Sequence, residues 1–208
     1  TGVTQGAGMT LQSLDSLQIA QALQALVRPG DTFWWGQATA EPLTLTQALT
    51  THRHAIAQGG RLRVFVGIGL ADTLRPEQAD VLDFFGYAAS GPHRALAKAG
   101  VLDIVPCHYS HLPQLIAQGS LPADVVLVQV SPPDAQGRYS LGLVHEYLTA
   151  ALEKARVVVA EVNPDIPWTH GSVYLTEADM ALCVAATVAP AALERSEPGP
   201  AEQAIAQH

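Results

Sequence analysis

Short runs of successive apolar residues constrain the fold of this chain more than any other feature of its sequence. Residues 125–131, 155–163 and 180–188 are largely apolar at consecutive positions, whereas a half-solvated strand would alternate polar and apolar residues. Strands buried on both faces have this pattern, because helices cover both sides of their sheet. Right-handed crossover connections then favour parallel strands. We therefore predict an α/β domain with a mostly parallel sheet and helices on both faces.

Helical and extended segments alternate along most of the chain. The expected strands cover residues 31–36, 61–68, 83–89, 102–108, 125–131, 155–163 and 180–188. The expected helices cover residues 14–27, 45–56, 90–100, 111–119 and 142–155, where apolar side chains recur near helical spacing. Ser13 or Asp15 is expected to cap the first helix, and Pro29 and Gly30 to end it.

The chain is rich in apolar residues and poor in positive charge. Of its 208 residues 48% are hydrophobic, its net charge is −8, and no cluster of Lys and Arg occurs. This composition is typical of a globular domain and argues against a nucleic-acid partner. An anionic cofactor is still compatible with it, because helix N-termini and backbone amides bind phosphate without basic side chains.

Cysteine content and hydropathy bear on the cellular location. Cys107 and Cys183 lie at or inside apolar runs, which indicates reduced thiols rather than a disulfide framework. No segment approaches the roughly 20 apolar residues of a membrane-spanning helix. Residues 1–8 lack the basic and apolar regions of a signal peptide. We predict a cytoplasmic protein with no membrane partner.

Composition changes near both ends of the chain. Residues 1–10 are expected to form a flexible leader, and residues 11–192 the α/β domain. Residues 194–200 have the charge and proline content of a linker, and residues 201–208 resemble the first turns of a helix. So short a helix is marginal on its own. We therefore expect residues 193–208 to be a linker and the start of a truncated second domain.

Four loops that follow expected strands are candidates for binding a ligand. They cover residues 36–42, 108–113, 131–142 and 163–171 and are rich in Gly, Pro, Ser, Thr, Asn and His. Ligands of open parallel sheets bind beyond the carboxyl ends of the strands, so these loops are expected at one rim. The candidate binding residues are Gly36, Gln37, Ala38, Thr39, Tyr109, Ser110, Ser131, Pro132, Asn163 and His170.

Each loop also has a purely structural interpretation. The 36–42 loop fits an ordinary strand-to-helix turn, since small residues suit such turns as well as ligand contact. The 131–142 loop fits a long connection with a type I turn over residues 134–137. The 163–171 loop, with its Trp and two prolines, fits a lid packed on the core.

Other catalytic motifs are weak or absent. Gly67 and Gly69 suggest a dinucleotide fingerprint whose third glycine is missing. The paired histidines at 52 and 54 and at 108 and 111 have no carboxylate or cysteine to complete a metal site, so we predict no metal. No G-x-S-x-G motif occurs. Glu161, in an apolar strand, is either a buried acid or nucleophile, or a carboxylate satisfied by neighbouring backbone groups.

Three segments carry a resemblance to a known family. They are RPGDTFWWGQATAEP at residues 28–42, GPHRALAKAGVLDIVPCHYSHLP at residues 91–113, and the run of residues 124–171 with its SPPD…G…SLG and NP…P…HG motifs. Together they resemble the amino-terminal domain of the acetyl-CoA hydrolase/transferase family, which includes 4-hydroxybutyrate and succinyl-CoA:acetate CoA-transferases. The resemblance covers most of residues 14–190 and implies a CoA-transferase-like three-layer α/β/α fold.

The resemblance implies a reaction as well. Members move coenzyme A between an acyl-CoA and a small carboxylate, or pass the acyl group to water, through a glutamate that attacks the thioester. That glutamate belongs to a carboxyl-terminal domain, so we assign no catalytic residue to this chain. Implied partners are acyl-CoA, a small carboxylate, a carboxyl-terminal catalytic domain or subunit, and further copies in a homo-oligomer. Coenzyme A is a substrate here, and the candidate loops shape the acyl or carboxylate pocket.

The acyl group and two rival functions stay open. Trp34 and Trp35, and the sequence of residues 37–39, depart from the small or aliphatic residues expected at these positions in the family. A stand-alone module that binds an acyl-CoA or a small acid without catalysis is the main alternative. A sugar-phosphate isomerase or sensor ranks last, because the loops lack the acidic and lysine residues it needs. The linker and partial helix at residues 193–208 favour the CoA-transferase interpretation.

Overall fold

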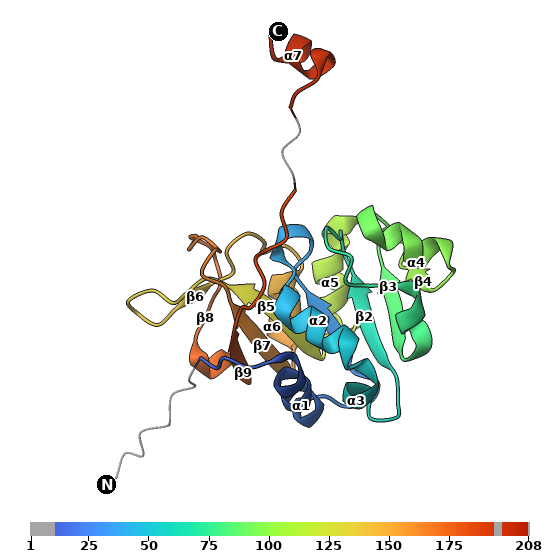
Figure 1. Cartoon of the computed structure of the whole chain (residues 1–208), viewed down its shortest axis with the longest axis vertical. Coiled ribbons are helices and arrows are strands. Elements are labelled where there is room, and N and C mark those ends of the chain that lie inside the picture. The colour runs from blue at the N-terminus through green and yellow to red at the C-terminus, as the bar shows by residue number, and fades with distance from the viewer. Residues whose placement is uncertain (1–10, 194–196, 208) are drawn as a thin grey trace.

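A seven-stranded parallel sheet forms the centre of the computed structural model, which describes residues 11–193 and 197–207 (Figure 1). Its spatial order is β4 (Leu102–Ile104), β3 (Leu82–Gly86), β2 (Leu62–Val66), β1 (Thr32–Trp35), β5 (Val125–Val130), β7 (Val157–Val162) and β9 (Leu182–Ala185). Every neighbouring pair in this sheet is parallel. The strand order reverses at β1. From β1 the chain continues through β2, β3 and β4 toward one edge of the sheet, and β5, β7 and β9 then follow on the other side of β1.

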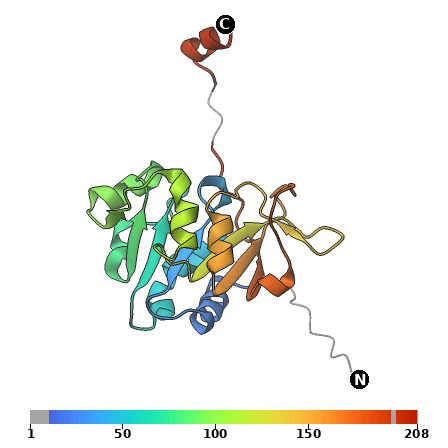
Figure 2. The same ribbon diagram turned by 180° about the vertical axis from the view of Figure 1, so that it is seen from behind.

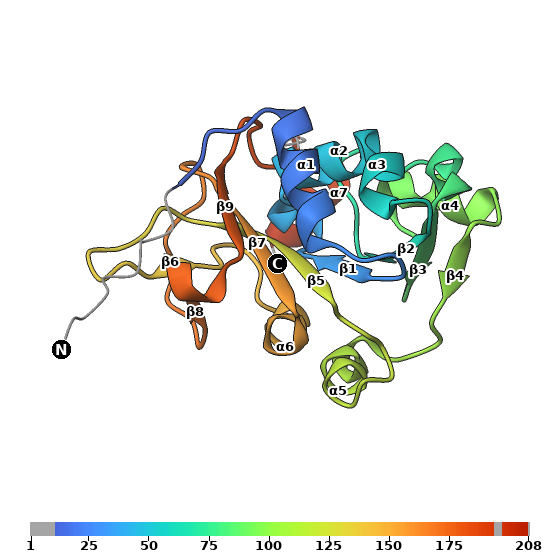
Figure 3. The same cartoon turned by 90° about the horizontal axis from the view of Figure 1, so that it is seen from below.

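Helices cover both faces of the sheet, which confirms the predicted fold class. The helices α1 (Ser16–Leu26), α2 (Leu43–Thr51), α3 (Arg53–Ala57) and α4 (Arg94–Lys98) lie on one face, and α5 (Leu112–Ala117) and α6 (Leu148–Lys154) on the other (Figure 3). Seen from behind, the yellow-green α5 and the orange α6 stand in front of the strands (Figure 2). Short 3-10 helices occupy Ala38–Ala40, Pro76–Asp80, Gly91–His93, Tyr109–His111 and Glu177–Asp179.

Local sequence signals explain where α1 begins and ends. Asp15 accepts a hydrogen bond from the backbone N–H of Gln18 at 2.8 Å, and the Gln18 side chain accepts one from Asp15 N at 2.9 Å. This reciprocal pair is a capping box, which satisfies amides that have no partner inside the helix. The helix stops at Leu26, before Pro29 and Gly30, as predicted.

Two apolar cores, one on each face of the sheet, follow from the alternation of side chains along the strands. The core under α1–α4 contains Phe33 and Trp35, whereas the opposite core contains Trp34. Trp34 stacks on Phe65 with ring centroids 3.9 Å apart and donates from Nε1 to the carbonyl oxygen of Pro122 at 2.8 Å. Aromatic side chains thus fill the interior directly below the carboxyl end of β1.

The predicted helix over residues 142–155 is wrong in its first half. Only Leu148–Lys154 is helical, and residues 142–147 form turns. Gly142 has φ +63° and Glu146 has φ +39°, which no right-handed helix accommodates. Leu143 is 44% exposed, so its side chain does not pack in the core although its spacing in the sequence is helical. The predicted helix over residues 45–56 is also divided, at His52, into α2 and α3.

A second, antiparallel sheet was not predicted. It joins β6 (Tyr139–Ser140) to β8 (Tyr174–Leu175) and projects from the β9 side of the domain (Figure 1). The turn expected at residues 134–137 is present, since Gly137 N donates to the Asp134 carbonyl oxygen at 2.9 Å. Arg138 lies 4.9 Å from the ring centroid of Tyr174, which itself stacks on Trp168. The 163–171 segment therefore packs on this ribbon.

The last described segment is helical. The helix α7 (Pro200–Ala206) follows Gly199, and all its residues are exposed. The linker expected at residues 194–200 falls partly outside the described residues, and the leader expected at residues 1–10 lies wholly outside them. In the part of the chain that the structure describes, no helix has the length and apolar character needed to cross a membrane.

Candidate functional site

Gln37 joins four loops at the carboxyl edge of the sheet. Its Oε1 accepts from the backbone N–H of Ile68 at 2.9 Å and from the hydroxyl of Tyr87 at 2.8 Å. Its Nε2 donates to Glu146 Oε2 at 2.8 Å and lies 3.3 Å from the Tyr109 hydroxyl oxygen. The side chain is only 7% exposed, and its full complement of hydrogen bonds is used. Gln37 therefore acts as a cross-link between loops.

Tyrosine hydroxyls surround the Gln37 amide. Tyr109 packs against Tyr87 and Tyr147 at centroid distances of 5.2 and 6.3 Å, and Tyr147 donates to the Trp35 carbonyl oxygen at 3.0 Å. Burial, and next the hydrogen bond and negative charge of Glu146, raise the pKa of Tyr109 well above its usual range. Burial also raises the pKa of Tyr87 and of Tyr147. These groups are neutral phenols at physiological pH and serve as hydrogen-bond donors.

The 36–42 loop begins with a close backbone approach. A Cβ on Gly36 would lie 2.8 Å from the Ala40 Cβ and 2.9 Å from the Ala40 carbonyl oxygen, so this turn requires glycine. The next residues form a 3-10 turn over Ala38–Ala40, with Ala38 at φ +54°. Ala38 and Thr39 are half-buried, so the loop presents backbone and small side chains at the rim.

A buried polar layer lies below this loop on β5 and β7. Gln129 Nε2 donates to the Thr39 carbonyl oxygen at 3.0 Å. Asn163 Nδ2 lies 3.4 Å from Gln129 Oε1 and 3.2 Å from the Val188 carbonyl oxygen. Glu161, the neighbour of Gln129 across the sheet, accepts from Leu45 N at 3.2 Å. Asn163, a predicted binding residue, thus contacts the loop from below through Gln129.

The other predicted residues have local partners. Ser110 bonds to His108 Nδ1 within its own turn at 2.8 Å, and His170 packs edge-on against Trp168. Ser131 is buried, donates to the Pro132 carbonyl oxygen and accepts from Ser140 N, while Pro132 is exposed. The structure therefore brings Gly36, Gln37, Ala38, Thr39 and Tyr109 into one cluster, and Asn163 is connected to it through Gln129. Ser110 follows Tyr109 in the chain, whereas Ser131, Pro132 and His170 form their hydrogen bonds and ring contacts outside this cluster.

Sequence reasoning missed Tyr87, Glu146 and Ile68. Tyr87 follows β3, and its aromatic side chain gave no catalytic signal. Glu146 was hidden in a segment predicted to be helical, where a charge is ordinary. Gly67 and Gly69, beside Ile68, were noticed only as an incomplete dinucleotide motif. Their position after β2 was the available signal, because ligand loops follow parallel strands.

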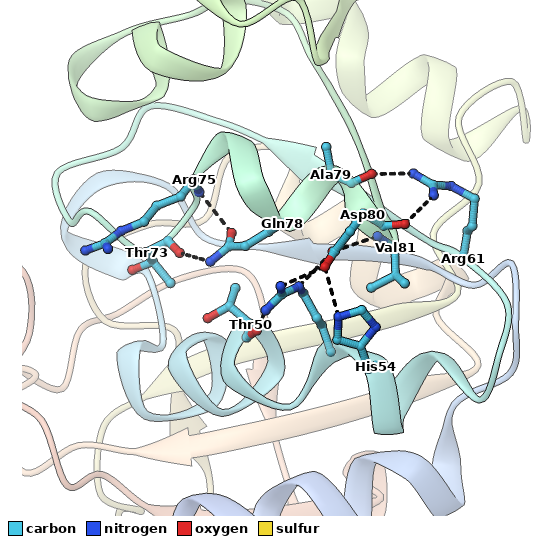
Figure 4. A network of polar contacts seen from close by, with 10 residues as sticks. Thr50, His54, Arg61, Thr73, Arg75, Gln78, Ala79, Asp80 and Val81 are labelled. Atoms are coloured by element: carbon cyan, nitrogen blue, oxygen red, sulfur yellow. Dashed lines mark hydrogen bonds and ion pairs between the residues drawn. The ribbon is translucent and has the colours of Figure 1, made fainter.

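A second polar cluster joins α2 and α3 to the 3-10 helix Pro76–Asp80 (Figure 4). It borders a cavity of about 460 Å³ lined by Thr50, Thr73, Arg75 and Gln78 among others. Its guanidinium groups are already paired, Arg53 with Asp80 and Arg75 with Asp72, each at 2.8 Å. The Arg53 guanidinium holds the pKa of Asp80 well below its usual range. This network fixes the 3-10 helix Pro76–Asp80 to α3 and shares no residue with the Gln37 cluster.

The buried carboxyl of Glu161 makes stability depend on pH. Burial raises its pKa from 4.5 to about 7, and Glu41, also buried with a raised pKa, acts in the same direction. Because the folded pKa exceeds the unfolded one, the stabilising contribution is complete below pH 4.5 and is lost as pH rises through 7. Relative to Glu161→Gln, the wild type should lose about 2 to 3 kcal/mol of unfolding free energy between roughly pH 5 and 8. Urea unfolding of both proteins tests this, and a constant difference across that range contradicts it.

Comparison with known proteins identifies the family to which this arrangement belongs. Residues 13–186 match the model of the acetyl-CoA hydrolase/transferase N-terminal domain. The chain belongs to this family. The match spans β1 to β9, and with them all the loops of the Gln37 cluster, so the resemblance seen in the sequence motifs is confirmed.

Curated relatives of this family are CoA-transferases. The chain is 29% identical over 174 residues to the 4-hydroxybutyrate coenzyme A transferase of Clostridium kluyveri, covering 84% of this chain and 40% of that protein. It is 28% identical over 168 residues to the butyryl-CoA:acetate CoA-transferase of Anaerostipes caccae, covering 79% and 38%. This CoA-transferase-family chain thus spans about two fifths of the length of the curated relatives it matches.

Solved structures agree with the fold. The 4-hydroxybutyrate CoA-transferase from Porphyromonas gingivalis shares 28% identity with a TM-score of 0.60, over 80% of this chain and 38% of that one. RipA from Yersinia pestis shares 23% identity with a TM-score of 0.78, over 93% of this chain and 45% of that one, which speaks for the fold alone. The three-layer α/β/α architecture is therefore that of CoA-transferase structures.

Proposed function

We propose that this chain is the amino-terminal part of a CoA-transferase or acyl-CoA hydrolase that moves coenzyme A between an acyl-CoA and a small carboxylate. The observation that carries the proposal is the Gln37 cluster, in which loops after β1, β2, β3 and β4 meet at one edge of a family-typical sheet. Residues 11–192 form this domain, and residues 193–208 lead into the next one. The enzyme works in the cytoplasm as a homo-oligomer.

The nucleophilic glutamate, in this proposal, comes from a carboxyl-terminal domain or partner subunit. Glu41 and Glu161 are buried and hold structural hydrogen bonds, which suits neither for attack on a bulky thioester. Glu146 is exposed, but it accepts from the Gln37 amide and neighbours the Tyr109 hydroxyl. Hydrogen bonds to a carboxylate reduce its nucleophilicity, so Glu146 organises the cluster.

This chain contributes one wall of the substrate cleft. Gly36, Ala38 and Thr39 present small groups at the rim, and Tyr109 presents a neutral hydroxyl beside them. Ser110, Ser131, Pro132, Asn163 and His170 shape the same wall from adjoining turns. Such donors suit the carbonyl and carboxylate oxygens of acyl groups, while the thioester carbonyl is attacked from the opposite wall. Coenzyme A is a substrate of this reaction, with no resident metal.

The proposed activity is tested by comparing this chain with the complete enzyme, meaning the chain together with its carboxyl-terminal domain or subunit. Exchange of coenzyme A from acetyl-, butyryl- or succinyl-CoA to a second carboxylate is followed by chromatography. We expect exchange or hydrolysis by the complete enzyme and none by the chain alone. A complete enzyme that binds acyl-CoA without converting any of these thioesters would instead be a binding module.

Gln37→Leu should lower kcat/KM of the complete enzyme by roughly 10- to 100-fold. The leucine keeps much of the volume but leaves Ile68 N and the Tyr87 hydroxyl without their acceptor, so the loops after β2 and β3 lose their attachment. Gln136→Leu, at an exposed position in the turn after Asp134, is the matched control. Steady-state kinetics of the two variants test this prediction. Equal kcat/KM values for Gln37→Leu and Gln136→Leu would contradict the cross-linking role of Gln37.

A further inference from the structure

Glu161 is a buried carboxylate to which the proposed reaction assigns no role. It lies on β7 between Gln129 of β5 and Val184 of β9, and it is 0% exposed. Val157 and Val159 of the same strand contribute to the core under α1–α4, so Glu161 faces that side as well. A carboxylate in such a position requires polar partners, because burying an unpaired charge is costly.

The partner of Glu161 is the amino-terminus of α2. Glu161 Oε2 accepts from Leu45 N, an amide of the first turn, at 3.2 Å, and the same amide also donates to the Pro42 carbonyl oxygen at 3.0 Å. The residue preceding this nine-residue helix is Pro42, which provides no side-chain cap. An N-terminal amide normally bonds to a Ser, Thr, Asp or Asn just before the helix. Here a carboxylate from a strand distant in sequence supplies a second acceptor for that amide, and its charge suits the helix dipole.

The 36–42 loop is consequently held by neighbouring strands at its middle and just beyond its last residue. Gln129 on β5 binds the Thr39 carbonyl oxygen, and Glu161, beside it on β7, binds Leu45 N just after the loop. Between these points Glu41 is buried and accepts from the Thr46 hydroxyl at 2.9 Å. The position of the loop therefore depends on side chains that lie below it.

We propose that Glu161 is a positioning residue that fixes the 36–42 loop through the first turn of α2. The inference rests on the proposed function, since the loop is taken to line the substrate cleft. Glu161 does not touch substrate in this account. It sets the backbone conformation from which Gly36 to Thr39 and the Gln37 cross-link are presented.

Ionisation of Glu161 changes the strength of this attachment. The carboxylate is a stronger acceptor for Leu45 N than the protonated acid. Burial raises the pKa of Glu161 to about 7, while the Leu45 and Thr44 amides oppose the shift and Glu41 adds to it. Glu41 is the titratable group facing Glu161 from the α2 side, and Gln129 and Val184 on the flanking strands are uncharged. Oε1 has no hydrogen-bond partner among the described residues. Desolvation of the buried carboxylate outweighs its stronger hydrogen bond, so ionisation favours opening toward water, and the loop is held less firmly above pH 7 than below it.

Hydrogen exchange tests the positioning role on this chain without any assay of activity. In the wild type, the protection factor of the Leu45 amide should fall about tenfold between roughly pH 6 and 8. In Glu161→Gln, which keeps an acceptor but cannot ionise, protection should not change with pH. Glu153→Gln, at an exposed position of α6, should behave as wild type. The same pH response in wild type and Glu161→Gln would overturn the proposal.

Kinetics of the complete enzyme provide the second readout. Glu161→Gln should remove a pH dependence of kcat/KM centred near 7 and keep the activity of the low-pH form within a few-fold. Glu161→Leu, which leaves Leu45 N with the Pro42 carbonyl oxygen as its acceptor and removes the link to β7, should lose about tenfold at all pH values. A retained pH profile in a folded Glu161→Gln enzyme would contradict the proposal. If wild-type enzyme shows no CoA exchange at all, the proposed function fails, and the exchange data on Leu45 still decide the role of Glu161.

Discussion

Trp34→Ala should destabilise the domain by about 3 to 5 kcal/mol, which exceeds the effect of any other single truncation considered for this chain. Trp34 is fully buried in the central strand β1, where its ring stacks on Phe65 and meets Phe85 and Tyr147 edge-on. Alanine would leave a cavity in the core under α5 and α6 and remove the hydrogen bond from Nε1 to Pro122. Urea unfolding followed by circular dichroism measures the loss.

Two variants define the control for this prediction. Trp34→Phe keeps an aromatic ring and loses mainly volume and the Nε1 hydrogen bond. Its loss of unfolding free energy should therefore be about half of that of Trp34→Ala. Trp168→Ala removes a half-buried ring from the β6–β8 ribbon and should cost less than about 2 kcal/mol. Equal losses for Trp34→Ala and Trp168→Ala would mean that Trp34 is not the centre of an aromatic core.

Gly142→Ala should cost about 3 kcal/mol, because it combines two unfavourable terms. Gly142 has φ +63°, a left-handed conformation that disfavours any Cβ, and an added Cβ would lie 2.2 Å from Ile166 Cγ2. The turn it occupies follows Ser140, whose hydroxyl accepts from Gly142 N at 2.9 Å and from Thr169 N at 3.0 Å. A displaced residue 142 should therefore also disturb the 163–171 segment. Thermal unfolding of the wild type and of Gly142→Ala measures the loss of stability.

Gly137→Ala separates the steric term from the conformational one. Gly137 has φ +74°, but nothing lies within 4 Å of the position of its missing Cβ. The cost should therefore be about 1 to 2 kcal/mol, from the left-handed backbone alone. If both alanine variants lose the same stability, the contact between residue 142 and Ile166 does not constrain this turn.

Local sequence patterns were sufficient to predict the parallel sheet and the presence of helices on both of its faces. Consecutive apolar residues in β5 and β7 identified strands buried on both faces, and Asp15, one of the two expected caps, marked the start of α1. The same reasoning failed over residues 142–147, where Leu143, Val144 and Tyr147 have helical spacing although Gly142 and Glu146 adopt positive φ. Apolar spacing reports which residues share a face only after the backbone conformation is known.

The Gln37 cluster could not be derived from local patterns. Its four side-chain contacts join residues 31, 50, 72 and 109 positions apart in the sequence. Sequence reasoning identified the 36–42 loop and Tyr109 because each follows a strand, but it had no means to pair them or to include Glu146. Likewise, one of the two interpretations of Glu161 was a carboxylate that accepts hydrogen bonds from the backbone. The structure shows such a bond at Oε2, but its donor, Leu45 N, is 116 positions away in the sequence.

The location of the covalent intermediate tests the central claim most directly. The complete enzyme is incubated with acyl-CoA, trapped and digested, and the peptide that carries the acyl group or coenzyme A is identified by mass spectrometry. The account predicts a modified glutamate outside residues 13–186, and no adduct when this chain is incubated alone. Modification of a glutamate within those residues, above all the exposed Glu146, would show that this chain supplies its own nucleophile and would contradict the account.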